Sequence, residues 1–329
     1  MDAFSEILAG LKLRGAMYFH AEFSAPWSVT SPESSELAPL LAPGEPQLVI
    51  YHLLVHGKAR ARLADGSLIA LSEGDIIVLP HGDEHELVSE SGGAVPREMN
   101  VCTQDVVAKV MTRDLAPLCA GGGGEKSRFI CGFMACDRYL SQPVLEGLPT
   151  AFKVHIRADQ AGQWLERSIH HLAESVASGD AGSQAMLAKL SEALFVDTLR
   201  RYVASLPAEQ TGWLAGARDP LVGKALALLH NRPNHDWTIA ELTKHVGLSR
   251  SALVERFSKF LEVPPMTYLT RWRLQLAARS LSTTSRGTAD IAADVGYESE
   301  AAFNRAFKRE FGVPPDRKST RLNSSHITI

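Results

Sequence analysis

Two sets of polar and charged residues recur at helical spacing near the carboxyl end of the chain. The first set is Ser249, Arg250, Ser251, Arg256 and Lys259, and the second is Ser299, Glu300, Asn304, Arg305 and Lys308. Arginine and asparagine side chains can pair with the edges of guanine and adenine, whereas serine and lysine suit phosphates. The two sets therefore suit contact with DNA. For any single residue, the alternative is an ordinary solvated helix face.

Both sets lie in an internal repeat. Its offset is 49 residues before a glycine turn and 50 after it, so that Gly247 recurs as Gly296 and Phe257 as Phe307. Each copy reads as a short amphipathic helix, the turn, and a second amphipathic helix that begins after a serine N-cap. This is the helix-turn-helix pattern, and two matched units are far more specific than one. The units are predicted at residues 238–261 and 288–311.

The residues between the two units, from Met266 to Leu281, are expected to form one rigid helix, because their apolar positions recur at helical spacing. If this helix separates the two recognition helices by about one turn of DNA, roughly 34 Å, both can enter successive major-groove segments on one face of the duplex. A single chain would then read an asymmetric site.

The carboxyl-terminal third resembles the AraC/XylS family of bacterial transcription regulators. The resemblance covers residues 219–315, and its most specific part runs from Asp290 to Pro315. It implies a DNA-binding domain over residues 219–318, promoter DNA and RNA polymerase as partners, and most often activation. Family sequences usually continue to a Tyr-Arg pair. Residues 319–329 instead have no helical period and are expected to be a non-native tail.

The amino-terminal part carries a different pattern. Residues 47–101 read as at least four short strands joined by turns, which favours a small barrel or sandwich. Within them, Gly74 to His85 fits G(x)5PxG(x)2H, the second sequence motif of cupin barrels. Residues 1–205 as a whole resemble the cupin-type sensor domain of one branch of the same regulators. That resemblance implies a sensing role without naming the signal.

The candidates for binding an effector or a metal in this part are His52, His81, His85 and Cys131. One hypothesis is a small organic effector in the barrel. Another is a divalent metal such as zinc, held for example by His52, His85 and Cys131. A third is oxidation of an exposed thiol of low pKa, among Cys102, Cys119, Cys131 and Cys136. The last is a purely structural barrel with hydrogen-bonded histidines.

From Ala161 onward the apolar residues recur at helical spacing, with one break at residues 178–182. This pattern predicts a helical hairpin. Its apolar stripe is expected to pack either on the barrel or on a second copy of the chain, which would make the protein a homodimer. Residues 206–218 are rich in proline, glycine and alanine and are predicted to be a linker.

Composition sets wider limits. The 329 residues, 45% hydrophobic and 22% charged, suit a globular protein of about two domains. Four cysteines without a CxxC pair favour reduced thiols, and no apolar run approaches the roughly 18 residues of a membrane span, so we expect a cytoplasmic protein. Residues 1–218 carry 18 Lys and Arg against 26 Asp and Glu, a net charge of −8, whereas residues 219–318 carry 15 against 11, a net charge of +4.

These observations predict a multi-domain protein, with an all-β cupin-like barrel and a helical hairpin followed by an all-α tandem helix-turn-helix domain. The expected function is sequence-specific DNA binding and transcriptional activation in response to a small molecule, a metal or a redox signal. No catalytic residues are assigned. The alternative is a cupin metalloenzyme, a dioxygenase or isomerase, fused to a DNA-binding module. The first cupin motif normally supplies a His-x-His pair, and its absence here counts against the enzyme.

Overall fold

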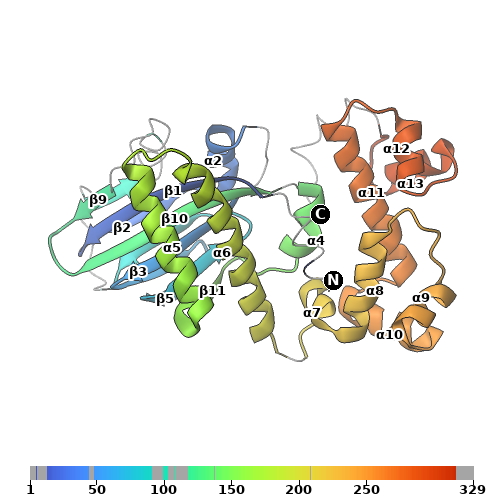
Figure 1. Cartoon of the computed structure of the whole chain (residues 1–329), viewed down its shortest axis with the longest axis horizontal. Coiled ribbons are helices and arrows are strands. Elements are labelled where there is room, and N and C mark those ends of the chain that lie inside the picture. The colour runs from blue at the N-terminus through green and yellow to red at the C-terminus, as the bar shows by residue number, and fades with distance from the viewer. Residues whose placement is uncertain are drawn as a thin grey trace. The chain divides into compact units, whose positions relative to one another are not determined.

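Strands from the first half of the chain assemble into two sheets (Figure 1). The computed structural model describes residues 13–43, 48–90, 99–102, 118–136, 138–207 and 209–315, together with residues 5 and 108. The first sheet has the strand order β11-β6-β3-β10-β1-β9 and the second β5-β4-β7-β2-β8. Neighbouring strands run antiparallel, except that β1 pairs with β9 and β2 with β8 in parallel. The strands are β1 (Leu13–Ser24), β2 (Ser28–Ser31), β3 (Leu48–His56), β4 (Lys58–Leu63), β5 (Leu68–Ser72), β6 (Asp75–Leu79), β7 (His85–Ser89), β8 (Asn100–Cys102), β9 (Leu118–Gly121), β10 (Lys126–Cys136) and β11 (Phe152–His155).

A helical hairpin packs on the first sheet. It consists of α5 (Gln160–Ala177) and α6 (Ser183–Ser205), which follow the short 3-10 turn η2 (Ile156–Ala158), while α2 (Ser34–Leu41) lies earlier in the chain. The Asp159 carboxylate caps α5 by accepting a hydrogen bond from the Gly162 backbone N–H at 2.9 Å. Arg201 of α6 donates to the same carboxylate at 2.7 Å and so joins the two helices. The hairpin contacts β1 and β11. Of the two packing surfaces expected from the sequence, the barrel is therefore in contact with the hairpin.

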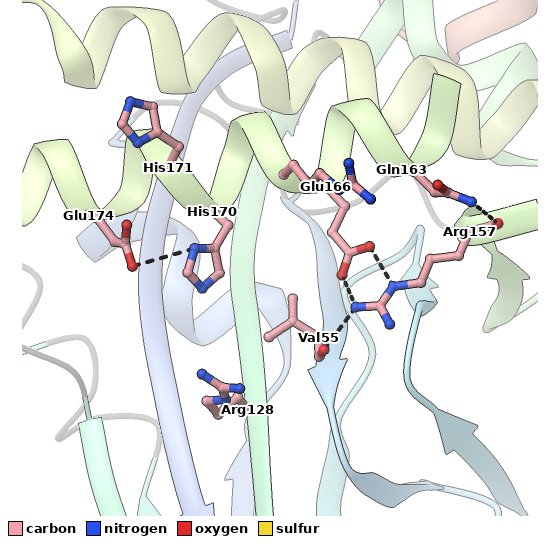
Figure 2. A pocket seen from close by; sticks show the side chains of 9 residues that line it. Val55, Arg128, Arg157, Gln163, Glu166, His170, His171 and Glu174 are labelled. Carbon is pink, nitrogen blue, oxygen red and sulfur yellow. Dashed lines mark hydrogen bonds and ion pairs between the residues drawn. The ribbon is translucent and has the colours of Figure 1, made fainter. Parts of the chain in front are cut away.

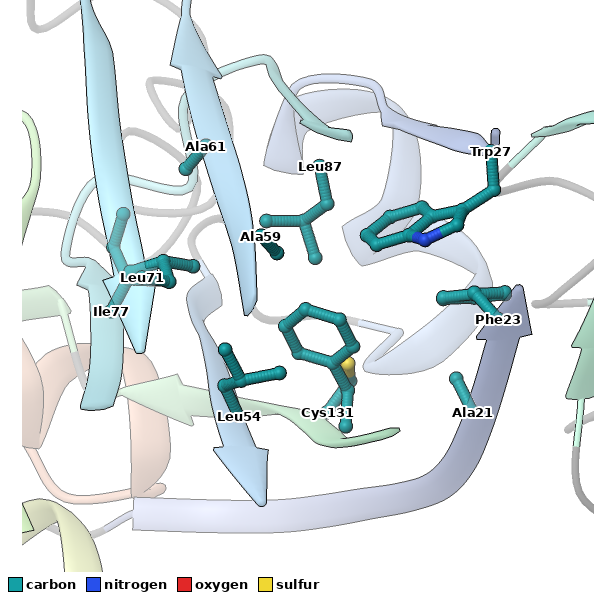
Figure 3. Packing of buried hydrophobic residues seen from close by; sticks show 11 residues of the cluster. Ala21, Phe23, Trp27, Leu54, Ala59, Ala61, Leu71, Ile77, Leu87 and Cys131 are labelled. Atoms are coloured by element: carbon teal, nitrogen blue, oxygen red, sulfur yellow. The ribbon is translucent and has the colours of Figure 1, made fainter. Parts of the chain in front are cut away.

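The space between the two sheets is filled by apolar side chains, as Figure 3 shows. Aromatic rings form much of this core: the ring centroids of Phe23 and Trp27 are 4.7 Å apart, and Trp27 meets Phe129 edge-on at 5.8 Å. Burial of apolar faces from both sheets drives their packing. The remaining members of the cluster are Ala21, Leu54, Ala59, Ala61, Leu71, Ile77, Leu87 and Cys131. The interior is therefore a packed core.

The rest of the described chain forms a helical unit with its own core. Of the described residues, this unit comprises 138–147, 206–207 and 209–315 together with residue 5, and the sheets with their hairpin form the other unit. Its helices are α4 (Arg138–Leu145), α7 (Trp213–Arg218), α8 (Pro220–Asn231), α9 (Ile239–Val246), α10 (Arg250–Leu261), α11 (Pro265–Thr283), α12 (Thr288–Asp294) and α13 (Glu300–Phe311). The predicted fold class, a β-rich domain followed by an all-α domain, is confirmed.

Two segments depart from the expected domain limits. Residues 138–147 lie between two strands in sequence, yet α4 packs on α11 and α7 of the helical unit. The segment expected to be a linker, residues 206–218, contains α7, because alanine and leucine favour a helix and the Trp213 side chain is buried. Trp213 Nε1–H donates to the Tyr268 hydroxyl at 2.8 Å and so anchors α7 to α11.

Some predictions fall on residues that the structure does not describe. The expected non-native tail, residues 319–329, and the side chain of Cys102 lie outside the described residues. Within the described ranges, no helix is both long and apolar enough to cross a lipid bilayer.

Candidate nucleic-acid interface and sensor site

The first helix-turn-helix unit is built by local hydrogen bonds. Thr238 caps α9 by accepting a hydrogen bond from the Glu241 N–H at 3.1 Å. Gly247 ends the helix at φ +84°, in the left-handed region that a residue without Cβ adopts at little cost. The Ser249 hydroxyl then accepts from the Ala252 N–H at 3.3 Å, so that α10 begins directly after the turn. These residues place the first turn of α10 at the surface.

The second unit repeats the glycine turn and the serine cap, but its first helix, α12, begins after Gly287 without a side-chain cap. Gly296 has the same φ of +84°, and the Ser299 hydroxyl accepts a hydrogen bond from the Ala302 N–H at 3.3 Å. The core of this unit comes from α11, α12 and α13, with Phe303 and Phe307 fully buried. The side chain of Tyr139 from α4 packs against the same core.

The helix α11 is tied to the loop that precedes α9 by a residue that sequence reasoning missed. The Arg273 guanidinium donates to the backbone carbonyls of Pro233 at 2.6 Å and His235 at 2.8 Å. It also lies against Gly296, since a Cβ built there would be 3.0 Å from the guanidinium carbon. Arg273 thus joins elements of both helix-turn-helix units.

Most residues of the two predicted DNA-contacting sets are exposed. In the described structure, the exposed members are Ser249, Arg250, Ser251, Arg256, Lys259, Ser299, Glu300, Arg305 and Lys308. Asn304 is half-buried, and its Oδ1 has no hydrogen-bond partner among the described residues. Each set lies on the second helix of its unit. The sets therefore form two separate polar surfaces, each starting at a capped helix N-terminus.

Arg256 differs from the other members because its guanidinium is engaged within the protein. It donates to the Asp219 carboxylate from Nη2 at 2.6 Å and from Nε at 3.1 Å. The hydrogen bond to Asp219 raises the pKa of Arg256 above its ordinary value. Asp219 also caps α8, accepting from the Leu221 and Val222 N–H groups. The repeat contains a signal for this difference: Arg256 matches Ala306, which is buried on the packed side of α13.

The β-rich unit places two of its four candidate side chains in direct contact. His52 of β3 and His85 of β7 are buried, and their Nε2 atoms are 2.8 Å apart. His85 donates from Nδ1 to the Asp83 carbonyl at 2.8 Å, so its Nε2 accepts the proton of His52 Nε2. Burial lowers the pKa of His85 to about 4 and holds the pKa of His52 well below its ordinary value. Both imidazoles are therefore neutral near pH 7.

The other two candidates do not complete a metal centre with this pair. His81 is half-buried and its Nε2 lies 3.2 Å from the Leu148 carbonyl oxygen. Cys131 packs in the apolar core of Figure 3, where burial raises the pKa of its thiol. Among the residues that the structure describes, no three His, Cys, Asp or Glu side chains gather so that they could hold a metal ion. The described residues thus do not fit the zinc hypothesis.

The comparisons with known proteins assign both units to families. Residues 2–204 match the cupin family and residues 242–321 match a helix-turn-helix domain. The chain is 30% identical over 321 residues to a putative AraC-like transcription regulator of Streptomyces lividans, covering 96% of this chain and 97% of the relative. The chain belongs to the AraC-like transcription regulators.

Two further relatives agree with this assignment. A putative AraC-like transcription regulator of Streptomyces antibioticus is 29% identical over 325 residues, covering 96% of this chain and 97% of the relative. The RCS-specific HTH-type transcriptional activator RclR of Escherichia coli is 24% identical over 280 residues, covering 85% and 87%. This AraC-like regulator therefore joins a cupin domain to a DNA-binding domain, and the family predicted from the sequence is confirmed.

Proposed function

We propose that this AraC-like regulator activates transcription, and that its cupin domain, residues 1–205, responds to a small-molecule effector. The DNA-binding domain, residues 219–318, would read two neighbouring major-groove segments of one operator. The observation that carries the proposal is the pair of capped recognition helices α10 and α13 within one chain, each with exposed donors in its first turns.

The helix between the two units supports simultaneous binding. α11 has 19 residues, which at a rise of about 1.5 Å per residue gives a rod of about 28 Å. That length is comparable to one DNA turn of about 34 Å. Arg273 holds α11 against the Pro233 loop and the Gly296 turn, which stiffens the connection between the two units. A rod of this length favours two contacts on one face of the duplex.

The chemistry of the cupin domain favours a small molecule over the other two signals. The described side chains supply a pair of neutral imidazoles without a third metal ligand. The thiol of Cys131 is buried and its pKa is raised, so little thiolate is available for oxidation. Among the other described cysteines, Cys136 is buried and Cys119 is exposed. Among the cysteines whose side chains the structure describes, a redox signal would therefore have to act at Cys119.

Activation and assembly rest on separate observations and have their own tests. The Escherichia coli relative is named an activator, which favours the same sign of regulation and RNA polymerase as a partner. Trp164 on α5 and Met186 on α6 are 61% and 60% exposed, so the hairpin leaves apolar surface for a second copy. Light scattering of the purified chain measures whether it is a homodimer.

Mobility shift on promoter DNA from upstream of neighbouring genes tests DNA recognition. The full chain is expected to form a specific complex at moderate salt. Arg305→Ala is expected to weaken it by about 1–3 kcal/mol if Arg305 pairs with a base. Arg60→Ala, on the outer face of β4, is the matched control and should leave the affinity unchanged. Failure of the full chain to form any specific complex would refute the proposal.

Transcription in vitro with RNA polymerase tests the direction of regulation. Adding the full chain to the promoter that it binds is expected to raise the yield of transcript. A fall in transcript would show that the regulator is a repressor, while leaving DNA recognition intact.

A further inference from the structure

A cavity of about 470 Å³ lies in the cupin domain between α5 and the outer face of the first sheet (Figure 2). Its volume falls within the range of about 300–1,000 Å³ that is usual for small-molecule sites. Val55 of β3 and Arg128 of β10 come from the sheet side, and polar residues of α5 come from the helix side. The cavity is separate from the interior between the sheets, which the apolar core fills.

The helix wall of the cavity follows from the sequence of α5. The apolar residues Leu165, Ile169 and Leu172 are buried. Beside this stripe runs a second one that is polar and recurs every three or four residues, so its members lie along one side of the helix. The members of the polar stripe that line the cavity are Gln163, Glu166, Arg167, His170, His171 and Glu174.

One end of the cavity is closed by an ion-pair network in which every charge has a partner. The Arg157 guanidinium donates to both Glu166 carboxylate oxygens at 2.6 Å, to the Val55 carbonyl at 3.0 Å, and to Glu73. Glu166 is only 6% exposed. The hydrogen bond to Arg157 lowers the pKa of Glu73. These bonds use four of the five N–H donors of Arg157, and two carboxylates balance its charge, so Arg157 serves as a rigid wall.

Two other arginines that line the cavity have no such bonds. In the part of the chain that the structure describes, the guanidinium groups of Arg128 and Arg167 make no hydrogen bond or ion pair, and no dashed line reaches Arg128 in Figure 2. Glu22, which faces Arg128 across the β1–β10 pair, is hydrogen-bonded to Lys126 at 2.6 Å; this bond and, to a smaller extent, the charge of Arg128 lower the pKa of Glu22. Each guanidinium offers five N–H donors in a planar fork that matches a carboxylate or phosphate.

Two histidines near Arg128, His20 and His170, leave a further polar atom without a partner. The rings of His20 and His170 are 5.1 Å apart, and His170 Nδ1 lies 3.5 Å from the Glu174 carboxylate. Nε2 of His20 is buried and has no hydrogen-bond partner among the described residues. Burial lowers the pKa of His20, so the ring is neutral near pH 7 and can donate or accept one hydrogen bond.

We infer that this cavity binds a small organic anion, a carboxylate or a phosphate ester, with Arg128 and Arg167 as its charged contacts. The sheet and α5 each supply one arginine, so the anion joins the helical hairpin to the barrel. This site lies outside the barrel, unlike the interior site expected from the sequence. The further claim that the anion is the effector rests on the proposed function.

Isothermal titration calorimetry of the full chain tests the site, with inorganic phosphate, succinate and benzoate as probes. At least one probe is expected to bind saturably, with a dissociation constant of about 1 mM or lower. Binding of phosphate alone indicates a phosphate ester, and binding of succinate or benzoate indicates a carboxylate. Arg128→Gln and Arg167→Gln are each expected to weaken binding about tenfold. Arg60→Gln, on the other sheet, is the matched control and should leave the affinity unchanged.

Two results would overturn the anion site: no saturable binding of any of the three probes, or equal losses in the control and in the two cavity variants. Circular dichroism of the variants checks that they remain folded. Mobility shifts with the same samples separate the two proposals. A chain that binds promoter DNA but no anion refutes the site alone, and a chain that binds an anion but no promoter DNA refutes the proposed function alone. If the bound anion leaves the affinity for DNA unchanged, the effector role is refuted.

Discussion

Alanine substitutions at the two turn glycines should differ in their effect, although both glycines have the same backbone conformation. Gly247 and Gly296 each have φ +84°. An alanine in this left-handed region costs about 1–2 kcal/mol. A Cβ at Gly247 would meet nothing within 4 Å. Gly247→Ala is therefore expected to reduce the stability of the first helix-turn-helix unit by only this conformational amount.

At Gly296 the new methyl group adds a steric cost. Its position would be 3.0 Å from both Cζ and Nη2 of Arg273, and 3.1 Å from the Cα atom of Asn234. The backbone atom cannot yield easily, so Arg273 must shift from the carbonyls that it bonds at 2.6 and 2.8 Å. Loss of one such hydrogen bond adds about 1–2 kcal/mol. Gly296→Ala should therefore cost about 2–4 kcal/mol in total.

Amide hydrogen exchange on the full chain, read peptide by peptide, measures these costs locally. The protection of α12 and α13 should fall by the larger amount in Gly296→Ala, and that of α9 and α10 by the smaller amount in Gly247→Ala. Peptides from the cupin domain serve as the internal control. Equal losses in the two variants would refute the steric argument, because only Gly296 has a neighbour to displace.

Three further predictions test other contacts. Arg256→Ala should weaken specific and non-specific DNA binding alike, because the Arg256–Asp219 pair orients α10. Arg305→Ala should weaken the specific complex only. Mobility shifts on operator and unrelated duplexes distinguish the two effects, and a loss confined to the specific complex in Arg256→Ala would show that Arg256 reads a base. Iodoacetamide should label Cys119 but not Cys131 in the native chain, since burial raises the pKa of the Cys131 thiol. Mass spectrometry measures the labelling, and equal labelling of both thiols would contradict the prediction. In the folded chain the pKa of His85 is lowered from 6.5 to about 4, so on acidification the unfolded chain takes up a proton first. The free energy of unfolding of the cupin domain should therefore be highest above pH 6.5 and fall as the pH drops toward 4. His85→Gln should flatten this dependence in urea unfolding, and an unchanged slope would contradict the assignment.

The sequence predicts best what depends on residues within one turn of each other. The left-handed glycine at Gly247 and the cap at Ser249 need only local hydrogen bonds, and the structure contains both. The apolar periodicity of the hairpin likewise predicts the burial of Leu165, Ile169 and Leu172 on α5, although Trp164, which belongs to the same pattern, is 61% exposed. For the turn and the cap, the energy that selects the conformation comes from near neighbours, and for the hairpin the helical period alone marks the apolar face, so a pattern of residue types is enough.

The sequence predicts poorly what depends on pairs distant along the chain. Arg256 and Asp219 are 37 residues apart, and His52 and His85 are 33 apart. Nothing local marks Asp219 as a partner, although its position before Pro220 is a recognisable helix start. The repeat does contain the match of Arg256 with a buried alanine, but the residue type and the helical spacing of its set suggested DNA contact.

The cavity beside α5 could not be predicted from the sequence for the same reason. Its polar stripe reads as an ordinary solvated helix face. The fold brings Arg128 of β10 and Arg157 of η2 opposite that stripe. The ion pair of Arg157 with Glu73, 84 residues away in sequence, then shows that Arg157 already has a partner. The spacing of the histidines, by contrast, pointed to the barrel interior.

The path of the chain around α4 limits how this regulator can be dissected. The chain passes from one compact unit to the other at residues 137/138, returns at 147/148, and crosses again at 205/206. A fragment that begins at residue 206 therefore loses the Tyr139 side chain that packs on the core of the second helix-turn-helix unit. It also leaves the surfaces of α7 and α11 that α4 covers open to water. A single cut at the apparent boundary thus does not release an intact DNA-binding half.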